Sequence, residues 1–168
     1  MEPRFLAVDV QYDEAADTGW VAGLWFDRWT DPVPVRSDVR LHFGLQPYAP
    51  GEFYKRELPA LLELVLESVD LGEVHTVIVD SYVDLGAEPG MGRHLWHALD
   101  RRVRVVGVAK TRFNSADPIE VIRGESTRPL YITATSDAQE AADGVASMHG
   151  AYRIPTLLKA VDALARGR

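Results

Sequence analysis

Apolar and polar residues alternate in a regular way along the first quarter of this chain, and the pattern predicts strands. Residues 4–10 form a short apolar run with one acid inside, which is typical of a buried strand ending near Asp9. A polar turn separates it from a second predicted strand at 19–26, and a weaker alternating pattern at 35–43 predicts a third. The chain is therefore expected to begin with strands.

Beyond residue 57, helical and strand-like patterns take turns. Leucine and alanine recur at helical spacing from Glu57, with Pro59 expected in the first helical turn, where proline is tolerated. The remaining patterns predict strands at 74–80, 103–110 and 129–135, and helices at 90–100, 137–152 and 154–167. Strands followed by helix–strand alternation predict an α/β fold, a mixed sheet with helices packed on its faces.

Length, composition and charge limit the classes of protein to consider. The 168 residues, 46% hydrophobic and 26% charged, suit one domain spanning 1–168. A net charge of −7 argues against a surface built mainly for phosphate contacts, although it also provides carboxylates for a divalent cation. Absence of cysteine, of a membrane-length apolar run and of a leader-like N-terminus leads us to expect a cytoplasmic protein.

Three acids are candidates for a common site. Asp9 and Asp80 each follow a β-branched run, and neighbouring strands would bring both carboxylates to one crevice beyond the strand ends. Glu57, at the start of a predicted helix, is a third candidate. Taken singly, each acid is better explained as a turn former or a helix cap. Three converging carboxylates would repel one another without a cation, so together they favour a magnesium site able to activate water.

Several dispersed segments, in order, resemble the endonuclease V family. They are PYAPG (47–51), KRELPALLE (55–63), VIVDSY (77–82), VVGVAKTRF (105–113), PLYIT (129–133) and AYRIP (151–155). The resemblance extends from about Asp9 to residue 155. It implies a ribonuclease-H-like fold and a metal-dependent endonuclease that acts in nucleic-acid repair. Such an enzyme nicks DNA or RNA near a deaminated base such as inosine, with Mg²⁺ as cofactor and Mn²⁺ as substitute.

Matched position by position, the resemblance assigns catalytic roles to four residues. Asp9, Glu57 and Asp80 match the acids that hold the metal ion. Lys110 matches the lysine of the Gly-Val-Ala-Lys segment and is expected to contact a phosphate or to position the attacking water.

The resemblance also implies a wedge that enters the duplex beside the altered base. Two prolines would hold the intervening tyrosine in one pose, so that its ring can fill the space left by an extruded nucleotide. The alternative is a proline-stiffened loop whose tyrosine packs on the core. The expected nucleic-acid-binding residues here are Pro47, Tyr48, Pro50 and Gly51, with Lys55 and Arg56 on phosphates.

Two family motifs are altered, and the resemblance implies that the changes fall on the pocket for the flipped base and on groups around the metal ligands. After Asp80 the family has Gly-His-Gly and a second histidine, where this chain has SYVDLGAEPG; Tyr82 and Asp84 are the nearest polar substitutes. Tyr82 is expected to keep one hydrogen-bonding role toward nucleic acid. Near the last strand, TATSD replaces Gly-His-Arg, and Asp137 is the candidate for a further acid, in competition with Gln139 or Glu140.

These differences leave alternatives to the inosine-directed nuclease. One is a nucleic-acid-binding homologue that has lost catalysis or changed its base specificity. Another is a metal-dependent hydrolase of small phosphate compounds.

Overall fold

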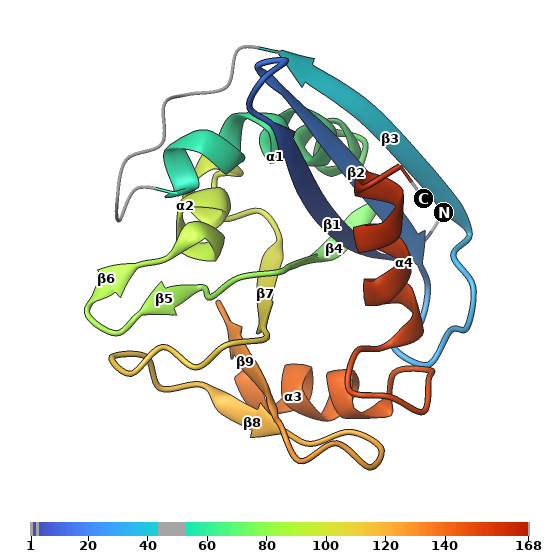
Figure 1. The fold of residues 1–168 in the computed structure, drawn as a ribbon, viewed down its shortest axis with the longest axis vertical. Coiled ribbons are helices and arrows are strands. Elements are labelled where there is room, and N and C mark those ends of the chain that lie inside the picture. The colour runs from blue at the N-terminus through green and yellow to red at the C-terminus, as the bar shows by residue number, and fades with distance from the viewer. Residues whose placement is uncertain (1, 3, 44–52, 168) are drawn as a thin grey trace.

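A seven-stranded mixed sheet lies at the centre of the protein in this computed structural model (Figure 1). The structure describes residues 2, 4–43 and 53–167, without the side chains of 53–56. The strand order is β3-β2-β1-β4-β7-β9-β8, and β1, β4 and β7 run parallel while the other pairs are antiparallel. The strands are β1 (Arg4–Asp13), β2 (Thr18–Phe26), β3 (Arg36–Phe43), β4 (Val74–Val79), β7 (Arg104–Ala109), β8 (Ile119–Val121) and β9 (Leu130–Ala134).

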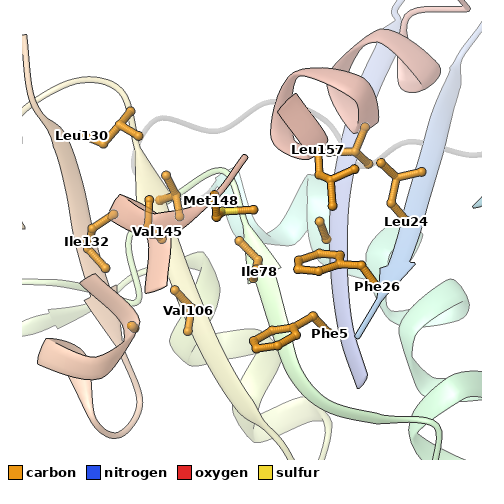
Figure 2. Packing of buried hydrophobic residues seen from close by; sticks show 14 of the residues in the cluster. Phe5, Leu24, Phe26, Ile78, Val106, Leu130, Ile132, Val145, Met148 and Leu157 are labelled. Carbon is orange, nitrogen blue, oxygen red and sulfur yellow. The ribbon is translucent and has the colours of Figure 1, made fainter. Parts of the chain in front are cut away.

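Helices cover both faces of the sheet, as the sequence pattern predicts. On one face lie α1 (Phe53–Asp70) and α2 (Met91–Ala98); on the other lie α3 (Ala138–Ser147) and α4 (Thr156–Ala165). Figure 2 shows the second face, where Phe5, Ile78 and Val106 of the sheet meet side chains of α3 and α4. Because both faces are buried, the central strands β4 and β7 are almost continuously apolar.

Alternation along β1 decides which face each side chain occupies. Phe5 and Ala7 belong to the core under α3 and α4, whereas Leu6 and Val8 belong to the core under α1 and α2. Asp9 continues the first series, so the strand directs its carboxyl group toward α4.

Two local predictions are wrong in detail. β1 does not end near Asp9: it stays paired with β2 as far as Asp13, while its parallel pairing with β4 stops at Ala7. Pro59 lies in the second turn of α1 and not the first, because the helix already begins at Phe53.

Further differences concern short elements. The predicted helix 137–152 ends at Ser147, and an irregular loop leads from it to α4. The sequence pattern also missed β8 and a small hairpin of β5 (Asp84–Leu85) and β6 (Glu88–Pro89). None of the described helices is both long and apolar enough to span a bilayer.

A buried arginine holds the loop between α3 and α4. Arg123, 4% exposed, donates hydrogen bonds to the backbone carbonyls of Met148, Gly150, Tyr152 and Arg153. Burial lowers the pKa of Arg123. One guanidinium thus satisfies carbonyls that regular structure leaves unpaired and fixes the start of α4.

We expect Arg123→Ala to lower the free energy of unfolding by about 3 kcal/mol, because several carbonyl groups lose their donor. Chemical denaturation followed by circular dichroism measures this change. Arg128→Ala, at an exposed arginine nearby, is the control and should change stability by less than about 0.5 kcal/mol. Equal stabilities of the two variants would contradict the role given to Arg123.

Candidate active site

Asp9 and Asp80 lie where two neighbouring parallel strands separate. Asp80 directly follows β4, and Asp9 lies two residues beyond Ala7, the last residue of β1 that pairs with β4. Both line a hollow of about 200 Å³ together with Glu57 of α1. This hollow lies at the carboxyl edge of the parallel strands. The convergence of the three acids on one metal ion stays a prediction.

Lys110 joins this group from the next parallel strand. It directly follows β7, and its Nζ atom donates to Asp80 Oδ2 at 3.1 Å. Its backbone carbonyl accepts a hydrogen bond from Arg153, which also donates to the carbonyl of Pro129. The strand end that carries the lysine is thus tied to the loop that precedes α4.

A fourth acid, Asp162, reaches the site from α4 and was not singled out from the sequence. Its carboxyl group lies within hydrogen-bonding reach of the Asp9 carboxyl. Arg166, one turn later, donates from Nε to both Asp162 oxygens at 3.1 and 3.0 Å. The sequence feature that could have identified Asp162 is its position beside the apolar residues Leu158 and Val161 of the same helix.

The neighbouring carboxyl groups of Asp9 and Asp162 have pKa values shifted in opposite directions. Burial, the hydrogen bond with Asp162 and the charge of Asp80 raise the pKa of Asp9 from 3.8 to about 7, although the Val10 N–H donates to Asp9 Oδ1 at 3.0 Å. Burial also raises the pKa of Asp162, but the hydrogen bond with Asp9 and the Arg166 guanidinium outweigh it and leave the pKa lowered. Of the two acids, Asp9 is therefore the more readily protonated.

Of the groups in this site, the Asp9 carboxyl is the best candidate ligand for a cation. Its Oδ2 atom is buried and receives no hydrogen bond from an N–H or O–H donor of the described residues. The surrounding oxygen donors are the type that Mg²⁺ and Mn²⁺ prefer. In the arrangement described, however, no three His, Asp or Glu side chains of residues 2, 4–43 and 57–167 lie close enough together to hold a metal ion.

The further acid predicted at 137–140 is not part of the site. The Thr135 N–H bonds to the Val105 carbonyl near the amino end of β7, whereas Lys110 lies at the opposite end of that strand. Asp137 follows Thr135 by two residues and is exposed at the start of α3. Glu140 pairs there with Arg104 at 2.6 Å, and Gln139 bonds to a neighbour on α3. The prediction failed because the antiparallel strand β9 carries the chain away from the acids.

Tyr82 lies inside the protein. The side chain is 6% exposed; its hydroxyl donates to the Thr111 carbonyl at 2.8 Å and accepts from the Phe113 N–H at 3.0 Å. Burial raises its pKa. Asp84, the other polar substitute considered, forms a two-pronged ion pair with Arg93 at 3.1 and 2.9 Å. Both printed hydrogen bonds of the Tyr82 hydroxyl are thus made with backbone groups of the protein, at residues 111 and 113.

The predicted wedge falls outside the described residues. This applies to Pro47, Tyr48, Pro50 and Gly51, and to the side chains of Lys55 and Arg56, whose backbone belongs to α1.

Solved structures of endonuclease V share this fold. Human endonuclease V is 21% identical with a TM-score of 0.75, and the match covers 99% of this chain and 84% of that one. The Ciona intestinalis enzyme, in complex with a DNA containing an inosine, is 17% identical with a TM-score of 0.76, covering 98% and 84%. Endonuclease V from Streptomyces avermitilis is 22% identical with a TM-score of 0.73, covering 99% and 81%.

No protein-family model matches the sequence, and no curated protein matches it. At these identities the similarity establishes a common fold. The resemblance to endonuclease V read from the dispersed motifs is therefore confirmed at the level of the fold.

Replacing Asp9 by asparagine should stabilise the protein above neutral pH in the absence of divalent cations. With a pKa of about 7 in the folded state against 3.8 unfolded, Asp9 favours folding fully below pH 3.8, and this stability is lost as the pH rises through 7. Asparagine stays neutral, so Asp9→Asn should gain about 4 kcal/mol over the wild type between pH 4 and pH 8, at about 1.4 kcal/mol for each unit by which the pKa is raised.

Urea denaturation with EDTA across this pH range provides the measurement. Asp143→Asn, at an exposed acid of α3, is the matched control and should follow the wild-type curve. A stability difference between Asp9→Asn and wild type that does not change with pH would refute the raised pKa of Asp9.

Proposed function

We propose that this protein is a metal-dependent endonuclease that hydrolyses a phosphodiester bond near a deaminated base such as inosine in DNA or RNA. The observation that carries the proposal is the common hollow lined by Asp9, Glu57 and Asp80, which come from three separate elements. The fold shared with endonuclease V structures, one of which holds inosine-containing DNA, supports the same function.

Asp9, Glu57 and Asp80 would hold the cofactor, Mg²⁺ with Mn²⁺ as substitute. Their carboxylates are hard oxygen donors, and a cation would replace the proton that Asp9 now requires. A divalent cation in such a site activates water and stabilises the leaving oxygen of the phosphodiester. Asp162, ionised and paired with Arg166, adds negative charge on the α4 side of Asp9.

Lys110 would stabilise charge on the scissile phosphate. In the absence of substrate its ammonium group pairs with Asp80, and both side chains are 41% exposed, so a phosphate can reach the same nitrogen. The attachment of its strand end through Arg153 keeps this ammonium next to the acids. Attack of water on the phosphorus would leave a 3′-hydroxyl and a 5′-phosphate.

Recognition of the altered base is assigned to the segment before α1. Tyr48, held between Pro47 and Pro50, would fill the gap left by the extruded nucleotide. Lys55 and Arg56 at the start of α1 would contact phosphates, where their positive charge offsets the negative net charge of the chain.

We expect Asp80→Ala to reduce nicking of an inosine-containing oligonucleotide by at least about 10³-fold, since the position would lose both a metal ligand and the partner of Lys110. The assay follows single-turnover cleavage in Mn²⁺ at low salt, and circular dichroism verifies the fold. Asp143→Ala, on the surface of α3, is the control and should cut at the wild-type rate.

The same assay distinguishes the alternatives. Wild-type protein that binds the strand but never nicks it would indicate a homologue without catalysis. Cleavage of nucleotides alone would indicate a hydrolase of small phosphate compounds. Cleavage by Asp80→Ala at the wild-type rate would contradict the assignment of the catalytic centre to these acids.

A further inference from the structure

Strand β3 is an edge of the sheet that the described part of the chain leaves open. It is the outermost strand on its side of the sheet, and β2 is its neighbour there (Figure 1). All eight residues of β3 pair with β2 without a shift in register. The strand contains neither proline nor lysine, two residues that commonly prevent an edge strand from pairing with another chain. Its outer row of backbone N–H and C=O groups is thus a regular template for a further strand.

The side chains of β3 reverse the usual arrangement, in which polar residues face solvent and apolar residues face the protein. Every second residue is polar and half-buried on the side of α1, where Arg40 pairs with Glu67 at 2.7 Å. The residues between them are apolar and exposed: Val39 to 37%, Leu41 to 38% and Phe43 to 68%. Ion pairs therefore hold the polar side of the strand, and the apolar side is left toward solvent.

The apolar side of β3 belongs to the face of the sheet on which α4 lies. Ala22 of β2 is part of the core under α3 and α4 and is opposite Val39, so Val39 points to the same face. Trp20 and Leu41 form the next pair on this face, and Trp20 is also exposed. α4 packs against β1 and β2, while the apolar side chains nearer the edge remain exposed. Such a group of exposed apolar side chains marks an interaction surface.

We propose that β3 is the interface between two copies of this chain, which pair their β3 strands antiparallel about a two-fold axis at Val39 and form one continuous sheet. An axis perpendicular to the sheet keeps each face on its own side, so residues that come opposite each other share a face. Val39 then meets Val39 of the second copy, and Leu41 meets Ser37. The exposed apolar side chains of both copies come together in one row across the join.

Charge selects this register from the symmetric alternatives. With the axis at Val39, Asp38 comes opposite Arg40 of the second copy, and symmetry makes this favourable pair twice. An axis at Asp38 or at Arg40 places two like charges directly opposite each other, which destabilises a strand pair. An axis at Leu41 leaves only residues 39–43 of the strand to pair.

Ion pairs within each chain support the same register. Asp38 and Arg40 already pair at 3.0 Å along one strand, so the contacts to the second copy extend an existing pair into a network across both strands. Arg36 comes opposite His42, and each of these side chains pairs with a glutamate of its own chain at 3.2 Å. No charged group of β3 is therefore brought to the interface without a partner of opposite charge.

The interface is separate from the candidate active site. Among the described residues, the hollow at Asp9, Glu57 and Asp80 is lined by side chains of β1, α1, β4 and α2 and by none of β3. Association through β3 does not use the groups assigned to catalysis. The inference therefore goes beyond the proposed nuclease and can be tested without it.

A single introduced cysteine tests the pairing and its register, because the chain contains no cysteine. Val39→Cys places two thiols opposite each other across the axis, on Cα atoms about 4.5–5.5 Å apart, which a disulfide can span. Mild oxidation should then convert most of the protein to a covalent dimer of twice the 18.7 kDa chain mass on a non-reducing gel.

Leu41→Cys is the matched control, since it lies on the same face and is equally exposed. In the proposed register the two copies of residue 41 are four residues apart along the paired strands, about 13 Å, beyond the reach of a disulfide. It should stay a single chain under the same oxidation. Cross-linking of both variants to the same extent, or of Leu41→Cys alone, or of neither, would overturn the proposed pairing.

An exchange of charges tests association in solution without a covalent link. Asp38→Arg and Arg40→Asp should each weaken dimer formation at least about 10-fold, because like charges then face each other twice. An equal mixture of the two variants should recover the dimer, since every arginine at these positions meets an aspartate. Sedimentation velocity measures the mass, and circular dichroism verifies that each variant is folded.

The mass of the complex decides the outcome. A wild-type protein with the mass of one chain up to about 100 μM, or variants that associate no better when mixed than alone, would contradict the interface. If Arg40→Asp does not fold because its bond to Glu67 is lost, the two cysteine variants still decide the question. None of these readouts depends on cleavage, so failure of the interface and failure of the nuclease are distinguishable.

Discussion

The fold raises the free-energy cost of ionising one carboxyl group, that of Asp9, and the properties of the site follow from this cost. Asp9 projects from β1 toward α4 and is enclosed by Asp80 and Asp162, so its negative charge is disfavoured by burial and by its neighbours. A proton or a cation at this carboxyl group relieves that cost. The cost follows from the fold, because β1, β4 and α4 each place an acid at the same edge of the sheet.

Among the described residues, Asp80 and Asp162 each pair with a cationic side chain, whereas Asp9 does not. Arg166 pairs with Asp162 and Lys110 pairs with Asp80, whereas the donor to Asp9 among the described residues is the Val10 N–H. The segment after Lys110 and the loop before α4 are each held by a buried polar side chain. The holding groups are the guanidinium of Arg123 and the phenol of Tyr82, and loops fixed in this way commonly carry functional residues.

Much of the fold and part of the site could be predicted from the sequence. The apolar runs of β4 and β7 predict the parallel core, Asp80 marks the end of β4, and β1 differs only in its length. Lys110 could be found only through the dispersed motifs. Asp162 was missed because an acid beside the apolar stripe of a terminal helix looks like an ordinary surface residue. The bonds of Tyr82 go to backbone groups, which no side-chain pattern records.

The account depends on a cation taking the place of the Asp9 proton. A crystal soaked in Mn²⁺ at pH 8 and measured at a wavelength where manganese scatters anomalously tests this most directly. We predict an anomalous peak bounded by carboxylate oxygens of Asp9, Glu57 and Asp80, with oxygen–metal distances of about 2.0–2.3 Å. A well-diffracting crystal with no peak between these side chains, or with a peak that excludes Asp9, would contradict it.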